Sequence, residues 1–302
     1  MDNASGTGNR SGKVQAMDPV AALAQLGGVA GLRQLLQLTT RRRLRQAVER
    51  GEINRPAHDL YRLAEADAAL VIASEVGGVV SHLSAATLHG WEVAFPATCP
   101  WITVRPNAPV AKKDGMHLFW SDLTDEPGPV TSPARTVIDC ARRLALGPAL
   151  AVADSALRHR SVTSAELRVH ADRVRGKGAA QARSVVRHAS ALADNPFESM
   201  LRAHAIEAGL EVAPQVPIPI RGLVVHPDVV DRRRRLVLEA DSWEFHSGRE
   251  AHARDCWRYT MLVVLGWRVL RFTWRQVMHE PDYVRSCLVA AREGPPGKEN
   301  VA

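Results

Sequence analysis

The sequence lacks several features that would assign it to a familiar class. Its four cysteines are widely scattered and form no CxxC or Cys/His pattern, which argues against a zinc site and favours a reduced setting. No apolar run is long enough to span a bilayer, and the polar N-terminus has no signal-peptide core. There is no GxGxxG or GxxxxGK phosphate loop. These absences predict a cytoplasmic protein without a membrane partner.

Lysine is also scarce, and arginine far outnumbers it. The formal net charge is +7 and the isoelectric point about 9.7. This excess favours an anionic partner, because the planar guanidinium can donate two hydrogen bonds to one phosphate. A solvated basic surface would have the same composition. The 302 residues, 46% of them hydrophobic, predict two or three domains with sizeable cores.

Residues 19–63 follow a polar segment, 1–18, that we expect to be a disordered tail. Helices are expected over 20–26, 29–38 and 41–50, and a hairpin over 53–63. Three helices and a hairpin predict a winged helix-turn-helix. Leu44 and Val48 would share one face of the third helix, leaving other side chains free to face DNA. The predicted DNA-binding residues are Arg41, Arg42, Arg45 and, in the hairpin, Arg55. The alternative is a solvated basic face.

Residues 64–193 predict a mixed α/β middle domain that ends in a helical linker. Helices are expected over about 71–80 and 81–90, around a Gly77-Gly78 break, and strands over 101–105 and 116–120. Ser132 and Pro133 open another helix, and Ser132 has the role of a cap rather than of a nucleophile. His82 and His89 are interpreted as helix-surface or capping residues. The segments SHLSAATLHG and TSPARTVIDCA, together with the helices before them, resemble the AbiEi-type antitoxins. This resemblance implies promoter binding by the winged helix.

Carboxylates gather around HPDVVDRRRRLVLEAD, residues 226–241. An apolar run over 223–230 and a second over 236–238 flank an arginine-rich turn, which predicts a hairpin. Alternate residues of a strand share a face, so Glu239 and Asp241 should point the same way, and the hairpin can bring Asp228 beside them. Carboxylates crowded at the ends of core strands repel one another, and a bound Mg²⁺ removes that penalty.

A helix start, Asn195-Pro196-Phe197-Glu198, precedes the hairpin, and Leu265-Gly266-Trp267-Arg268 opens a later strand. This ordered set resembles the PD-(D/E)XK nuclease superfamily and, more closely, its very-short-patch-repair endonuclease group. The resemblance covers about 195–291. It implies a restriction-endonuclease-like α/β sandwich over 194–292, with a tail over 293–302. The lysine that the superfamily carries two residues after the glutamate is replaced here by Asp241.

The resemblance also implies roles for individual residues. Asp228 and Glu239 would hold Mg²⁺ or Mn²⁺, and Asp241 would add a ligand or fill the space of the lysine. Glu198 would cap its helix, reach the metal through water, or do both. His246 would deprotonate water, with His252 as a rival. Arg254 and Asp255 could orient His246, bind phosphate or form a solvated helix face. The DNA backbone could be held by the turn residues Arg232, Arg233 and Arg234.

The fold class predicted from the whole sequence is therefore α/β. It consists of a winged helix-turn-helix, a mixed middle region and an endonuclease-like sandwich. The predicted function is a DNA-binding protein with a metal-dependent endonuclease domain. The alternative is a non-catalytic, antitoxin-like transcriptional regulator whose nuclease fold has degenerated. Fold resemblance alone does not separate the two. The sequence predicts no particular oligomeric state.

Overall fold

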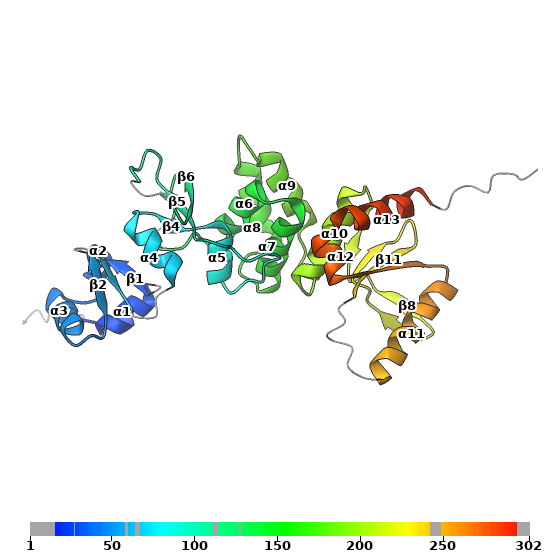
Figure 1. Ribbon diagram of the computed structural model, residues 1–302, viewed down its shortest axis with the longest axis horizontal. Coiled ribbons are helices and arrows are strands. Elements are labelled where there is room, and N and C mark those ends of the chain that lie inside the picture. The colour runs from blue at the N-terminus through cyan, green and yellow to red at the C-terminus, as the bar shows by residue number, and fades with distance from the viewer. Residues whose placement is uncertain are drawn as a thin grey trace, which may run out of the picture. The chain divides into compact units, whose positions relative to one another are not determined.

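The computed structural model describes residues 16–26, 28–57, 60–63, 67–110, 114–126, 128–241 and 249–294 (Figure 1). The chain forms two compact units. The first comprises the residues up to 80 together with 102–114 and 118–129, and the second comprises 81–101, 115–117 and the residues from 130 onward. Most of the tails predicted at 1–18 and 293–302 lies outside the described residues. Asp18 is described, and its carboxylate caps the first helix.

The N-terminal part of the first unit is a small three-stranded antiparallel sheet with three helices. The strand order is β1-β3-β2. A core of Leu23, Leu35, Leu44, Ile53 and Tyr61 joins the helices to the sheet. The elements are α1 (Pro19–Gln25), β1 (Val29–Gly31), α2 (Leu32–Leu35), α3 (Arg41–Glu49), β2 (Asn54–Ala57) and β3 (Leu60–Arg62).

The helix predicted over 29–38 is wrong at its start. Val29 and Ala30 form strand β1 and pair with Arg62 and Tyr61 of β3, and only Leu32–Leu35 is helical. The apolar spacing of this segment suits a helix, but pairing with a distant strand buries Val29 and Ala30 in the core. Long-range pairing therefore overrides the local pattern.

The rest of the first unit contains α4 (Ala68–Glu75) and a sheet of order β4-β5-β6. Its strands are β4 (Val79–Val80), β5 (Trp101–Val104) and β6 (His117–Trp120). The helix predicted to reach residue 80 ends at Glu75. A Cβ atom on Gly78 would lie 2.8 Å from both the Ile102 side chain and the Thr103 carbonyl oxygen, so only glycine allows β5 to approach this closely.

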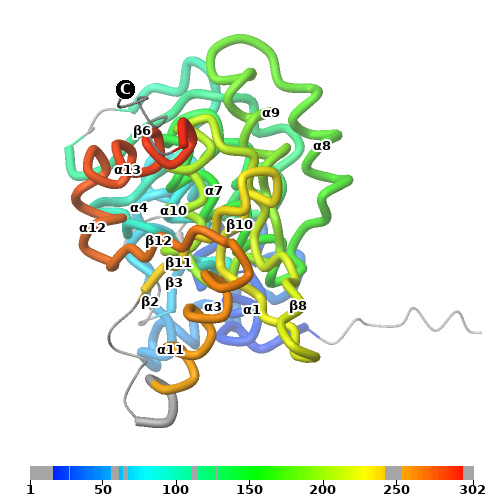
Figure 2. Tube along the Cα trace, turned by 90° about the vertical axis from the view of Figure 1, so that its right-hand side faces the viewer, coloured from blue at the N-terminus to red at the C-terminus, as the bar shows by residue number. Residues whose placement is uncertain are grey.

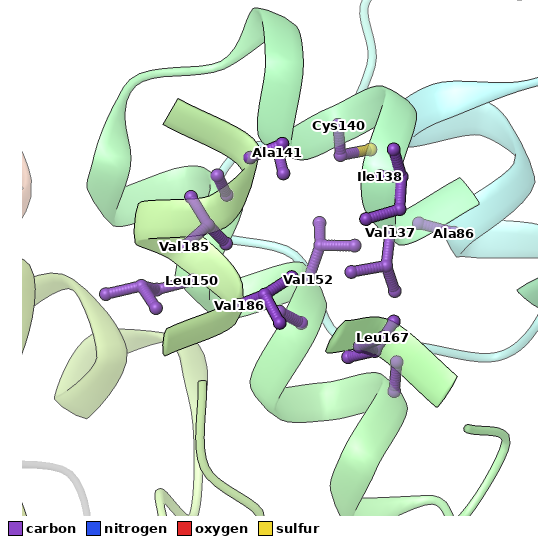
Figure 3. Close-up of a cluster of buried hydrophobic side chains, with 14 of the residues drawn as sticks. Ala86, Val137, Ile138, Cys140, Ala141, Leu150, Val152, Leu167, Val185 and Val186 are labelled. Carbon is purple, nitrogen blue, oxygen red and sulfur yellow. The ribbon is translucent and has the colours of Figure 1, made fainter. Parts of the chain in front are cut away.

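The second unit begins with a bundle of helices. These are α5 (His82–Leu88), α6 (Pro133–Arg143), α7 (Leu146–Arg158), α8 (Ser164–Arg173) and α9 (Ala179–His188). Figure 3 shows side chains of α6, α7, α8 and α9 meeting in one apolar core, among them Val137, Leu150, Leu167 and Val185. Helix α7 is buried on almost every side, as expected of a central helix whose small apolar residues surround its axis.

The two histidines of the antitoxin-like segment have different environments. His82 opens α5 and is 3% exposed, so the helix-surface interpretation is wrong for it. Its Nδ1 lies 2.8 Å from the Ser81 hydroxyl, and its ring packs against Trp101. His89 does lie at a helix end, where its ring stacks on Trp91 and its Nε2 lies 2.9 Å from the Thr131 carbonyl oxygen. Thus His89 connects the two sequence segments that carry the antitoxin resemblance.

The C-terminal part of the second unit is a four-stranded sheet of order β12-β11-β10-β7. Strands β11 and β12 are parallel and are connected through α11, whereas β10 is antiparallel to both of its neighbours. The elements are α10 (Pro196–Glu207), β7 (Ala213–Pro214), β8 (Ile218–Ile220), β9 (Leu223–Val225), β10 (Val229–Asp231), β11 (Leu236–Asp241), α11 (Arg249–Val264), β12 (Arg268–Thr273), α12 (Trp274–His279) and α13 (Pro281–Glu293).

Helices cover both faces of this sheet. Figures 1 and 2 show α13 and α11 on opposite sides of β11. Leu236 and Leu238 pack with α10, α12 and α13, whereas Val237 packs with α11 and β8. This alternation along β11 is that of a strand buried on both faces. The sheet with helices on both faces is compatible with the predicted α/β sandwich.

The apolar run over 223–230, which His226 and Pro227 interrupt in the sequence, forms two strands of different sheets. Residues Leu223–Val225 form β9, which pairs with β8 in a separate two-stranded sheet, and Val229–Asp231 form β10. The break lies at His226 and Pro227, where proline cannot donate a ladder hydrogen bond. Asp231, predicted to start the turn, is a buried strand residue whose Oδ1 accepts a hydrogen bond from the Arg234 N–H.

A buried ion pair joins the helical bundle to the C-terminal part of the second unit. The Arg202 Nη2 of α10 lies 2.5 Å from the Asp154 Oδ2 of α7, and the two side chains are 2% and 0% exposed. Asp154 also accepts hydrogen bonds from the Ser199 hydroxyl and the Ser190 N–H. The domain boundary predicted between residues 193 and 194 lies within this unit, so the two parts share a buried interface.

Candidate active site

Asp228 and Glu239 face each other at one end of the β10–β11 hairpin. Val229 pairs with Leu238, and this register places Asp228, just before β10, opposite Glu239 of β11. The Ala240 N–H donates a hydrogen bond of 2.8 Å to the Asp228 Oδ2 and fixes this carboxylate. The structure therefore brings together the two predicted metal ligands.

Burial perturbs the protonation of both carboxyl groups. Glu239 is 3% exposed, and burial, followed by the charge of Asp228, raises its pKa. Burial likewise raises the pKa of Asp228, although the Ala240 N–H and the Arg258 charge oppose the increase. Two buried acids that cannot both ionise freely at neutral pH are typical of sites that bind a cation or move a proton.

Glu198 has the capping role that its position in the sequence suggested, and its contact with a metal stays a prediction. Asn195 caps α10 by accepting a hydrogen bond from the Glu198 N–H, while the Glu198 carboxylate accepts hydrogen bonds from the Asp194 N–H and the Asn195 side chain. Burial, followed by the charge of Asp228, raises the pKa of Glu198 to about 7. The capping residue is thus electrostatically linked to the carboxylate pair.

The described residues fit a divalent cation held by two carboxylates. The Glu239 Oε1 is buried and has no hydrogen-bond partner among the described residues. An unpaired buried carboxylate oxygen is destabilising unless a cation or water satisfies it. In the same part of the chain no cluster of three or more His, Cys, Asp or Glu side chains has metal-binding geometry. Mg²⁺ needs only one or two carboxylates, since water and substrate phosphate complete its shell.

Asp241 lies on the same face of β11 as Glu239, as the alternation along the strand predicted, but it has a different partner. Its Oδ2 lies 2.6 Å from the Arg271 Nη2 of the neighbouring strand β12. Asp241 is therefore held in an ion pair at the place where the superfamily has a lysine. Its predicted role as a ligand remains a prediction.

Arg258 and Tyr259 belong to the site, although they were not among the residues predicted from the sequence. The Arg258 Nη2 lies 3.5 Å from the Glu239 Oε2 and donates a hydrogen bond of 2.7 Å to the Tyr259 hydroxyl. Both residues come from α11, which covers the Glu239 face of the sheet. The available signal was the spacing Arg254-Asp255-Arg258, since residues three and four apart share a helix face.

The predicted base lies outside this geometry. His246 falls within 242–248, outside the described residues, and the side chain of its rival His252 is likewise not described. Asp255 lies 3.6 Å from the Arg258 Nη2, and Arg254 is exposed. The role of His246 therefore stays a prediction.

The arginine-rich turn lies at the far end of the hairpin from the carboxylates. Three residues of β10, or about 10 Å of strand, separate Asp228 from the turn. Arg234 forms an ion pair with Asp231, and Arg235 donates to the Leu265 and Gly266 carbonyls at the end of α11. Arg232 and Arg233 are exposed. The turn is therefore not part of the carboxylate site, and DNA contact there stays a prediction.

Helix α3 presents its arginines as the sequence predicted. Leu44 is fully buried in the core, whereas Arg41, Arg42 and Arg45 are exposed. Arg55 of β2 is also exposed, with its guanidinium 5.5 Å from the centre of the Tyr61 ring. These four side chains are accessible to a polyanion.

Comparisons with known proteins agree with the nuclease-like geometry. The model of a restriction-endonuclease-like family, REase_MTES_1575, matches residues 197–291, which supports a nuclease-like C-terminal domain. Two proteins of Mycobacterium tuberculosis, "Uncharacterized protein MT2308" (strain CDC 1551 / Oshkosh) and "Uncharacterized protein Rv2248" (strain ATCC 25618 / H37Rv), are each 28% identical over 255 residues. The alignment covers 80% of this chain and 93% of each relative. It therefore extends well beyond the segment that the family model matches.

Among solved structures, the crystal structure of the RV2827C protein from Mycobacterium tuberculosis is similar to part of this chain. It is 14% identical, and the match covers 66% of this chain and 83% of that one, with a TM-score of 0.29. Among the described helices, none has the length and apolar character needed to cross a membrane.

Proposed function

We propose that this protein is a DNA endonuclease that uses Mg²⁺ or Mn²⁺ held by Asp228 and Glu239. The observation that carries the proposal is the buried carboxylate pair, with its unpaired Glu239 Oε1, at the end of a strand hairpin in a nuclease-like domain. Carboxylate oxygens at this position are suited to a hard divalent cation.

The residues of the site have distinct tasks in this reaction. When bound, the cation neutralises charge on the phosphodiester and lowers the pKa of water. The Ala240 N–H holds Asp228 in place, and the buried Oε1 of Glu239, which has no hydrogen-bond partner among the described residues, would bind the cation. Glu198, whose pKa burial raises to about 7, can take up or release a proton at neutral pH. His246 is the proposed base that activates the attacking water.

The test of this function is incubation of the purified full-length chain with supercoiled plasmid. Nicked or linear products should form with Mg²⁺ or Mn²⁺ and should be absent with EDTA. Asp228→Asn protein is the matched control for a contaminating nuclease. Cleavage that persists in EDTA, or that is equal in wild-type and Asp228→Asn protein, would overturn the proposal.

A second candidate is a non-catalytic regulator that binds an operator through its N-terminal helices. The observation that favours it is Asp241, which replaces the lysine and is neutralised by Arg271. Promoter binding without cleavage at any Mn²⁺ concentration would select this alternative. The unpaired oxygen of Glu239 favours the nuclease, because a purely structural carboxylate would be expected to have partners.

Metal affinity should rise with pH. The pKa of Glu198 is raised to about 7, and the pKa values of Asp228 and Glu239 are also raised. These carboxyl groups therefore retain protons that a cation must displace. Mn²⁺ should therefore bind about tenfold more tightly at pH 8 than at pH 6, as measured by calorimetric titration of DNA-free protein. Glu198→Gln protein should show a weaker dependence. An affinity that does not change with pH would contradict the proposed protonation.

DNA affinity should depend on the exposed arginines of α3. Replacement of Arg41, Arg42 and Arg45 by alanine should flatten the slope of log K against log salt by about 0.9 for each phosphate that the protein no longer neutralises. Arg232→Ala/Arg233→Ala protein serves as the control and tests the second predicted DNA-binding surface, because these arginines are also exposed but lie on another element. Fluorescence anisotropy with duplex DNA measures both slopes. If only the control flattens the slope, the binding surface is the β10–β11 turn.

A further inference from the structure

Arg258 is held more loosely by its acidic neighbours than by its neutral one. Its Nη2 lies 3.5 Å from Glu239 and 3.6 Å from Asp255, beyond the usual 2.7–2.9 Å of charge-assisted hydrogen bonds. The same nitrogen donates to the Tyr259 hydroxyl at 2.7 Å. The charge of Arg258 is therefore positioned by a phenol and remains available to another anion.

Arg258 and Glu239 each keep one buried polar atom without a hydrogen-bond partner in the described part of the chain. In Glu239 it is an acceptor, Oε1, and in Arg258 a donor, Nε. Each such atom is expected to destabilise the folded protein by about 1–3 kcal/mol. An acceptor attracts a cation and a donor attracts an anionic oxygen. The two neighbouring side chains are thus complementary to a cation that carries an anionic ligand.

Arg271 also lies near these residues, but it already forms an ion pair with Asp241. Its Nη2 lies 2.6 Å from Asp241, and its side chain is 43% exposed. Its guanidinium lies 4.3 Å from the centre of the Tyr259 ring, where it helps to hold the phenol that positions Arg258. Asp241, which stands in place of the lysine, thus holds Arg271 beside Tyr259. Arg258 is then the arginine without a short ion pair.

We propose that Arg258 is a catalytic residue that balances Glu239 in the metal-free protein and contacts the scissile phosphate when a divalent cation binds Glu239. This inference rests on the proposed function and deepens it, because it names the group that takes the place of the missing lysine. The cation and Arg258 carry like charges, so entry of the cation weakens the contact between Arg258 and Glu239. A planar guanidinium is suited to phosphate oxygens.

The experiment compares wild-type protein with Arg258→Met, which keeps an apolar stem beside Tyr259, and with Arg258→Lys, which keeps the charge. Mn²⁺ binding to DNA-free protein should be about tenfold tighter in Arg258→Met, because a repelling charge is removed. Plasmid cleavage at saturating Mn²⁺ should fall by about 10²–10³-fold in Arg258→Met and recover in part in Arg258→Lys. Arg285→Met, which replaces an exposed arginine of α13 that has no proposed role in the site, should behave as wild type.

The two measurements separate failure of this inference from failure of the proposed function. If wild-type protein cleaves but Arg258→Met has unchanged Mn²⁺ affinity or unchanged cleavage, the Arg258 inference is wrong and the nuclease stands. If wild-type protein binds Mn²⁺ but cleaves nothing, the proposed function fails, and the catalytic role of Arg258 fails with it. Thermal melting verifies that each variant is folded, and Arg258→Gln replaces Arg258→Met should the latter unfold.

Discussion

Glu239→Gln protein should lose DNA cleavage and, at pH 8 in EDTA, melt at a higher temperature than wild-type protein. Activity should fall because the amide removes the charge that holds the cation, and we expect a loss of at least ~10³-fold. Stability should rise because burial and Asp228 make the charged form of Glu239 unfavourable. One substitution should thus lower activity and raise stability, as is common where strained groups form a site.

The pH dependence of this gain has a definite sign. The folded protein holds the Glu239 proton more tightly than the unfolded chain does, so this group favours folding at low pH. The contribution is complete below the ordinary glutamate pKa of about 4.3 and is lost as the pH rises through the raised pKa. The stability difference between Glu239→Gln and wild-type protein should therefore grow from pH 5 to pH 8 and reach about 1–4 kcal/mol.

Thermal denaturation at the two pH values, with Glu211→Gln as control, measures this effect. Glu211 is exposed and forms an exposed ion pair with Arg233, so its replacement should change stability by less than ~0.5 kcal/mol. A Glu239→Gln protein that is less stable than wild type at pH 8 would show that the ion pair with Arg258 outweighs the cost of burial.

Asp154→Ala protein should be the most destabilised of the single variants considered, by about 3–5 kcal/mol. The substitution leaves Arg202 charged, 2% exposed and without its carboxylate, and it removes the acceptor used by Ser199 and Ser190. Glu198 lies one turn before Arg202 on α10, so cleavage should decline as well. Urea denaturation gives the free energy of unfolding.

The control is the double variant Asp154→Leu/Arg202→Met. A buried ion pair replaced by apolar side chains of similar size often restores stability, because no charge remains buried. The double variant should therefore be more stable than Asp154→Ala. If Asp154→Ala unfolds at the same urea concentration as wild type, the buried pair contributes little to the stability of the packing between α7 and α10.

Local patterns in the sequence were sufficient for the elements whose information lies within one segment. Asn195 and Pro196 predict the start of α10, and the alternation around Glu239 predicts which side chains share a face. Leu44 and Val48 predict which side of α3 is buried and hence that Arg41 is exposed. Each of these inferences needs only the helical or strand period and the chemistry of capping.

Other features depend on partners that are distant in sequence, which no local period reveals. The start of the second predicted helix became β1 because Val29 pairs with Arg62. The apolar run around Pro227 forms two strands because β9 pairs with β8 in a separate sheet. The parallel pairing of β11 with β12 places α11 over the Glu239 face of the sheet, and this brought Arg258 to the carboxylates.

The sequence by itself therefore determined the identity of the two acids, their place at the end of a hairpin and the basic face of α3. Only the tertiary structure decided that these acids are buried with one unpaired oxygen, that Asp241 is paired with Arg271, and that Arg258 lies beside Glu239. The physical reason is that burial and charge pairing are properties of packed elements. A strand carries its own period, but its neighbours determine the dielectric and the partners of its side chains.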